Sequence, residues 1–153
     1  MIKKFIARKK SEIGQSFMEL ALSMVFLLVL LTVVIDLGWA FYTMIALRDA
    51  AQEAASFGSM CPDADLIAER LRLSASTPIS MEDIPDDAEH IDIEFIDPQT
   101  GIEADPVHGN LVRVTAQVDH EIIVPFAASF LGRTSYPLRV NVADTVMRDT
   151  CPN

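Results

Sequence analysis

The chain has 153 residues, half of them hydrophobic, which is enough for one modest domain and too little for a two-domain enzyme. Its formal net charge is −10, yet the first 14 residues carry five basic side chains and only one acidic side chain. The remaining acidic body contains just seven arginines and no lysine, so it offers no basic surface to a phosphate backbone. We therefore expect no nucleic-acid partner.

A long apolar run follows the basic head. Residues 17–35 contain one charge, Glu19, and otherwise consist mostly of large apolar side chains. A helix of this length spans roughly 28 Å, close to the ~30 Å hydrocarbon core of a bilayer. The positive-inside rule places the basic head in the cytoplasm and the chain from Asp36 onward outside it. The sequence thus predicts a single-pass protein of the cell (inner) membrane with an extracytoplasmic carboxyl-terminal domain.

A glycine and a glutamate mark the junction between the head and the run. Gly14 ends the basic segment, and Glu19 follows five residues later at the membrane edge. This order is typical of a class III, prepilin-type signal, and a glycine lets an intramembrane protease accept an extended backbone. A plain membrane anchor whose glutamate reaches the headgroup region is the alternative for Glu19.

The segment from Gly14 to about residue 60 resembles the TadE-like family, which comprises minor pilin or pseudopilin components of tight-adherence (Flp-type) pilus systems. The resemblance lies in the Gly14/Glu19 pair, in Leu20-Ala21-Leu22, in Ile35-Asp36-Leu37-Gly38 and in the alanine-rich stretch 46–55. It implies cleavage by a prepilin peptidase after Gly14, which leaves Gln15 as the new amino terminus. In a pilin-like assembly, Glu19 would then pair with the free amine of Gln15 on a neighbouring subunit.

The resemblance also implies partners and a place in the cell. Besides the prepilin peptidase and the lipid bilayer, the expected partners are other pilin or pseudopilin subunits and the inner-membrane pilus assembly platform. After assembly, the subunit would be carried into a surface pilus that serves cell adhesion.

The chain is expected to have three parts: a basic prepilin leader at 1–14, a transmembrane and assembly helix at 15–60, and an extracytoplasmic α+β domain at 61–153. Small residues recur every fourth position late in this helix, at Ala46, Ala50, Ala54 and Gly58. Such a row allows another helix to approach closely. The other interpretation is that alanine simply favours helix.

Beyond the long helix, the pattern predicts a second helix over 62–73 and strands over 90–95, 111–118 and 136–146. We therefore expect an α+β fold, in which a small antiparallel sheet of three or four strands packs against the extracytoplasmic part of the long helix.

Two cysteines are present, Cys61 at the end of the long helix and Cys151 near the carboxyl terminus. In an oxidising compartment an even count favours a disulfide, so we predict that these two pair.

The sequence shows no residue pattern that is typical of an enzyme active site. His90, His108 and His120 are isolated, and the ten acidic residues between Glu82 and Asp105 match no calcium loop and are typical of a solvated surface. We expect no catalytic, cofactor-binding or metal-binding residues, and no cofactor.

Two other functions stay open. The chain could be an uncleaved single-span membrane protein with a partner-binding outer domain, or a secreted domain released near Ala40.

Overall fold

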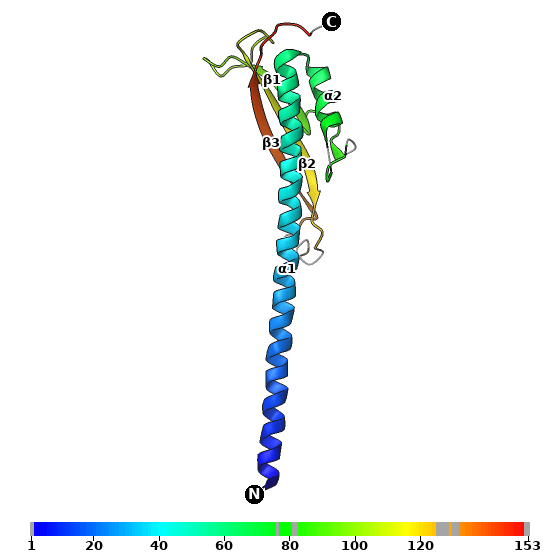
Figure 1. The fold of residues 1–153 in the computed structure, drawn as a ribbon, viewed down its shortest axis with the longest axis vertical. Coiled ribbons are helices and arrows are strands. Elements are labelled where there is room, and N and C mark those ends of the chain that lie inside the picture. The colour runs from blue at the N-terminus through cyan, green and yellow to red at the C-terminus, as the bar shows by residue number, and fades with distance from the viewer. Residues whose placement is uncertain (1, 76, 81–82, 125–128, 130–131, 152–153) are drawn as a thin grey trace. The chain divides into compact units, whose positions relative to one another are not determined.

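The computed structural model describes the backbone of residues 2–75, 77–80, 83–124, 129 and 132–151, and side chains from Gly14 onward within these ranges. The elements follow in the order α1 (Ile2–Met60), α2 (Ala64–Ser74), β1 (Ile91–Ile96), β2 (Leu111–Glu121) and β3 (Ser135–Thr145), as Figure 1 shows. The chain divides into two compact units, Met1–Leu37 and Gly38–Asn153, so α1 contributes residues to both.

The first unit is helical, and its side chains from Gly14 onward form no core. From Gly14 to Ile35, every side chain of α1 is exposed, including those of Leu22 and Phe26. The described part of the chain holds one helix that is long and apolar enough to cross a membrane, spanning Gly14–Met60. A stretch of this kind is helical because its residues favour helix and because, in lipid, a helix satisfies every backbone polar group internally.

The end of α1 and the start of α2 are set by local chemistry. Pro62 follows Cys61 and cannot continue a helix, because its ring removes the N–H and clashes with the preceding turn. One oxygen of the Asp63 carboxylate then accepts hydrogen bonds from the backbone N–H groups of Asp65 and Leu66, at 3.1 and 3.2 Å. This is an N-cap. The predicted second helix, 62–73, is therefore observed two residues later, at Ala64–Ser74.

Three antiparallel strands form the sheet, in the order β1-β2-β3. Ile93 pairs with Val114 in β1 and β2, and Val114 pairs with Val142 in β3. Each observed strand overlaps one of the three strands predicted from alternation. The α+β class is confirmed, with three strands rather than four among the described residues.

The core of the second unit lies between the helices and one face of the sheet. It includes Leu47 and Ala54 of α1, Ile67 and Leu71 of α2, and Val112 of β2, all fully buried. Figure 1 shows α1 and α2 in front of the strands. The late part of α1 can approach the sheet closely because its inward face carries mainly alanine.

Candidate membrane and assembly helix

The residues of the predicted processing junction lie on the exposed surface of α1. A side-chain carbon added at Gly14 would meet no other atom within 4 Å. The Gln15 side-chain amide donates to the Glu19 carboxylate over 3.4 Å, from one helical turn away. Gly14, Gln15 and Glu19 are therefore exposed, and Gln15 and Glu19 lie on the same face of the helix.

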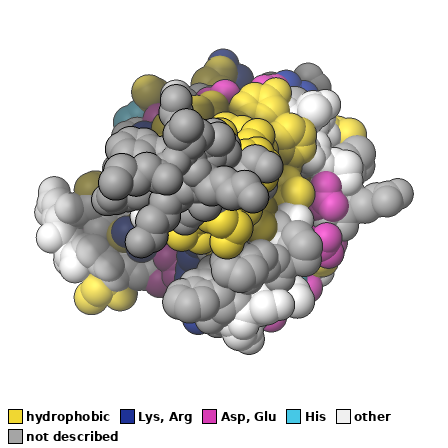
Figure 2. Space-filling view, turned by 90° about the horizontal axis from the view of Figure 1, so that it is seen from below, with side chains coloured by type: hydrophobic (Ala, Val, Ile, Leu, Met, Phe, Trp, Pro, Cys, Tyr) yellow, Lys and Arg dark blue, Asp and Glu magenta, His cyan; other side chains and the backbone are white. Residues whose placement is uncertain are grey.

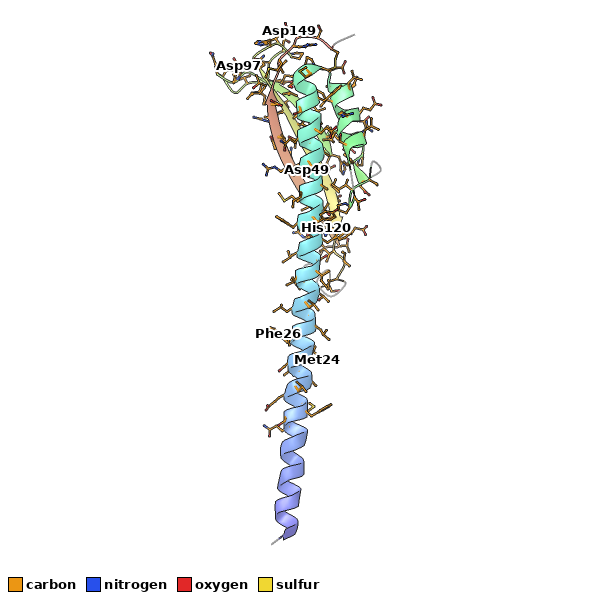
Figure 3. The ribbon with its side chains drawn as sticks, in the orientation of Figure 1. Met24, Phe26, Asp49, Asp97, His120 and Asp149 are labelled. Carbon is orange, nitrogen blue, oxygen red and sulfur yellow. A yellow bond between two sulfur atoms is a disulfide. The ribbon has the colours of Figure 1, made fainter. Side chains whose placement is uncertain are left out.

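The apolar run presents its side chains outward on all sides. Leu22 is 74% exposed and Phe26 is 66% exposed. Figure 2, seen from below, shows hydrophobic side chains gathered around the helix, and Figure 3 shows Met24 and Phe26 projecting from it. Soluble monomers rarely expose apolar surface on this scale, so lipid or other apolar helices must cover it.

Polar side chains within the run are satisfied by their own helix. The Ser23 hydroxyl donates to the Glu19 carbonyl over 2.8 Å, and the Thr32 hydroxyl donates to the Val29 carbonyl over 2.7 Å. Glu19 is then the one charged side chain between Phe17 and Ile35. A carboxylate inside an apolar span costs up to ~3 kcal/mol at the bilayer centre and less near its edge. Glu19 is consequently the residue in this run that most needs a partner.

The row of small residues faces the chain's own domain. Ala46 and Ala50 are 6% and 2% exposed, and Ala54 is fully buried. A side-chain carbon on Gly58 would lie 2.8 Å from the Ile67 side chain and 3.1 Å from that of Val112. Within one subunit, α2 and the sheet cover these residues, so the elements that approach this row closely belong to the same chain.

The two cysteines meet beside the end of α1. The structure joins Cys61 and Cys151 in a disulfide across a sequence separation of 90. The adjoining tail is also held by hydrogen bonds, because Met147 N–H donates to the Ser59 carbonyl over 2.7 Å and Val146 N–H donates to the Asn110 carbonyl over 2.8 Å. Sequence patterns gave no signal for these tail contacts.

Two carboxylates of the acidic segment, those of Asp87 and Asp97, accept hydrogen bonds from neighbouring residues in the chain. The His90 ring lies 2.7 Å from the Asp87 carboxylate, and this hydrogen bond lowers the pKa of Asp87. The pKa of Asp97 is also lowered, first by the backbone N–H of Gln99 and then by the Thr100 hydroxyl. Among the described residues, no group of three or more His, Cys, Asp or Glu side chains could hold a metal ion.

One small pocket lies at the amino-terminal end of the second unit. Its volume is about 290 Å³, and Trp39, Ile79, Val118 and His120 line it together with three carboxylates. The His120 ring is buried and lies 5.2 Å from the ring of Tyr136. The sequence did not single out this pocket, because its residues come from three separate segments.

The architecture is that of a small α+β domain preceded by one exposed apolar helix that is able to cross a membrane. Residues 14–56 match the family model described as TadE-like protein. This match confirms the resemblance seen in the sequence for residues 14–56, and it associates the chain with the tight-adherence pilus. No curated protein and no solved structure matches the chain.

Proposed function

We propose that this chain is a minor pilin or pseudopilin that takes part in assembly of a tight-adherence pilus, a type IV-related filament. One observation carries the proposal: the segment that matches the TadE-like model, residues 14–56, begins at Gly14 and includes the whole uncovered apolar run. The function is binding between subunits in and above the membrane.

The proposal includes maturation by a prepilin peptidase after Gly14. Cleavage removes the basic head and gives Gln15 a free, positively charged amine. Because Gln15 and Glu19 are one helical turn apart, the new amine and the carboxylate both lie near the end of the apolar run. Pairing Glu19 with the amine of a neighbouring subunit neutralises two charges that are costly in lipid.

The proposed topology leaves the basic head in the cytoplasm and the second unit outside. Two features support it: the basic residues precede the run, as the positive-inside rule requires, and the second unit carries a disulfide, which persists in oxidising compartments.

The two parts of α1 have different tasks. Its amino-terminal part has an apolar surface for lipid and for the helices of other subunits. Its late part is committed to the domain through Leu47, Ala51 and Ala55, which are buried in the core. Assembly contacts through α1 therefore belong to the run before Gly38 and not to the small-residue row.

Processing can be tested by substitution in cells that carry the pilus system. Gly14→Lys puts a long charged side chain at the proposed cleavage site, so we expect the full-length precursor to accumulate. Ser11→Lys adds the same charge three residues earlier and leaves Gly14 intact, so the mature form should persist. Equal sizes for both variants and for the unaltered protein would refute class III processing and favour the uncleaved single-span protein.

A further inference from the structure

The two edge strands of the sheet differ in which of their outward backbone groups are already hydrogen-bonded. The hydrogen bonds Val146 N–H to Asn110 carbonyl and Ile122 N–H to Thr134 carbonyl fix which residues of β3 face β2. Backbone groups of an antiparallel strand face alternate sides. Residues 136, 138, 140, 142 and 144 therefore bond to β2, and residues 137, 139, 141 and 143 direct their N–H and C=O groups away from the sheet.

At the outer edge of β3, the strand offers no free N–H at either end, whereas the backbone groups in the middle are open to pairing. Pro137 has no N–H to offer, and the N–H of Thr145 is taken by the Asp144 carboxylate at 2.7 Å. Between them, Arg139, Asn141 and Ala143 are exposed, and no backbone hydrogen bond from the described residues reaches their outward groups. In Figure 1, β3 borders the sheet on the side away from α2. An edge of this kind is a template for another strand.

The opposite edge, at β1, is open over a similar length. Gln117 N–H bonds to the His90 carbonyl, so residues 91, 93 and 95 face outward. The Ile91 N–H is taken by the Asp87 carbonyl, and the Phe95 carbonyl by the Ala104 N–H. Four outward groups are left: the Ile91 carbonyl, both groups of Ile93 and the Phe95 N–H. A pocket of about 240 Å³ lies beside Ile91 and Ile93.

We propose that β3 of one copy pairs with β1 of the next copy, so that the sheets of neighbouring subunits join into one. β1 and β3 both run antiparallel to β2 and hence run in the same direction. Copies inserted into one membrane with the same topology present their strands in the same sense, which makes this pairing parallel. This step rests on the membrane insertion of the proposed function.

The side chains of the residues that would align lie on the same face of the sheet, as the parallel arrangement requires. In a parallel ladder, a residue that bonds to the partner strand aligns with one that faces away from it. Arg139 and Asn141 thus align with Asp92 and Glu94, whose side chains lie, like theirs, on the face of the sheet opposite the core. In this register the N–H and C=O groups of Arg139 and Asn141 can form hydrogen bonds with the four open groups of β1. These are the Ile91 carbonyl, the N–H and carbonyl of Ile93, and the Phe95 N–H. A symmetric pairing of two β3 edges would instead be antiparallel, so the two subunits would point in opposite directions.

The charges of Arg139 and Asp92 specify the register between β3 of one copy and β1 of the next. Glu94 already pairs with Arg113 over 3.3 Å, whereas neither Arg139 nor Asp92 has an ion-pair partner among the described residues. Alignment of Arg139 with Asp92 gives each its partner across the joint. Because β3 and β1 are different surfaces, the contact does not close on itself in a dimer and repeats from copy to copy.

Crosslinking of the full chain in cell membranes tests this pairing. Asp92→Cys combined with Arg139→Cys, treated with a short thiol-reactive linker, should give a ladder of dimers, trimers and larger species. Each single variant should stay monomeric. A ladder that is absent from the double variant, or dimers from Arg139→Cys alone, would overturn the proposal.

A proline substitution tests the backbone hydrogen bonds of the proposed strand pairing separately from its side chains. Asn141→Pro in the double-cysteine chain removes one outward N–H and leaves the backbone hydrogen bonds to β2 in place, so the ladder should fall about tenfold. The side-chain hydrogen bond from Asn141 to the Thr115 hydroxyl of β2 is lost equally in the control variant Asn141→Ala. Asn141→Ala keeps the N–H and should keep the ladder. Equal ladders from both variants, each resistant to proteolysis as a folded domain, would contradict strand pairing.

Membrane sedimentation of the same samples separates the two proposals. A chain that sediments with membranes but gives no ladder refutes strand pairing alone. A chain that is recovered as soluble protein refutes the membrane insertion on which the pairing rests.

Discussion

Substitution of Gly58 tests where the late part of α1 packs. A side-chain carbon at this position would already lie 2.8 Å from Ile67 and 3.1 Å from Val112, two fully buried residues, and leucine adds three more carbons. Overpacking of a filled core costs about 1–3 kcal/mol, sometimes more. Replacement of glycine within a helix returns about 1 kcal/mol. Because leucine is far larger than the space, the overpacking cost lies at the upper end of this range, about 3 kcal/mol, and we expect Gly58→Leu to lower the free energy of unfolding by about 2 kcal/mol net.

The assay is urea unfolding of the full chain in detergent micelles, in which a protease digests the unfolded second unit and the intact fraction is measured. Gln52→Leu is the matched control, because Gln52 lies on the exposed face of the same helix and its variant should stay within about 0.5 kcal/mol. Equal unfolding midpoints for Gly58→Leu and Gln52→Leu would refute intramolecular packing of the small-residue row and would return that row to contacts between subunits.

Two further predictions concern the second unit. Thiol titration of the unfolded, unreduced protein should find no free thiol at Cys61 or Cys151, and reduction should lower stability by at most about 4–5 kcal/mol; two free thiols would contradict the disulfide. The Asp97 carboxylate has a folded-state pKa below its ordinary value of 3.8, so its stabilisation is present above 3.8 and is lost as pH falls through the folded-state pKa. Asp97→Asn should therefore lower the urea midpoint at neutral pH, and the difference from the unaltered chain should shrink well below pH 3.8; an unchanged difference would contradict the assignment.

Regular patterns made most of the fold predictable from the sequence. The break at Cys61-Pro62 and the capping Asp63 indicated the end of α1 and both ends of α2 to within about two residues, which is the usual uncertainty of helix ends. The start of α1 was not predicted in this way, because the helix begins at Ile2 and not at the expected residue 15. Strict alternation in His90–Phe95 and from Leu111 to Val118 indicated strands, because one face of this sheet is buried and the other is polar. Alternation persists in β3 as well.

Contacts between distant segments were not predictable in the same way. The spacing of Ala46, Ala50, Ala54 and Gly58 shows that something approaches α1 closely, but it does not show whether the neighbour belongs to the same chain. The pocket beside His120 and the open edge of β3 likewise depend on strand order and register, which follow from tertiary packing rather than from local pattern.

The amino terminus of the protein in native membranes tests the central claim most directly. Its mass can be measured on the amino-terminal peptide, with allowance for methylation or cyclisation of the first residue. The account predicts that the chain begins at Gln15. A chain that begins at Met1, or near Phe41, would contradict prepilin-type maturation and with it the assignment to pilus assembly.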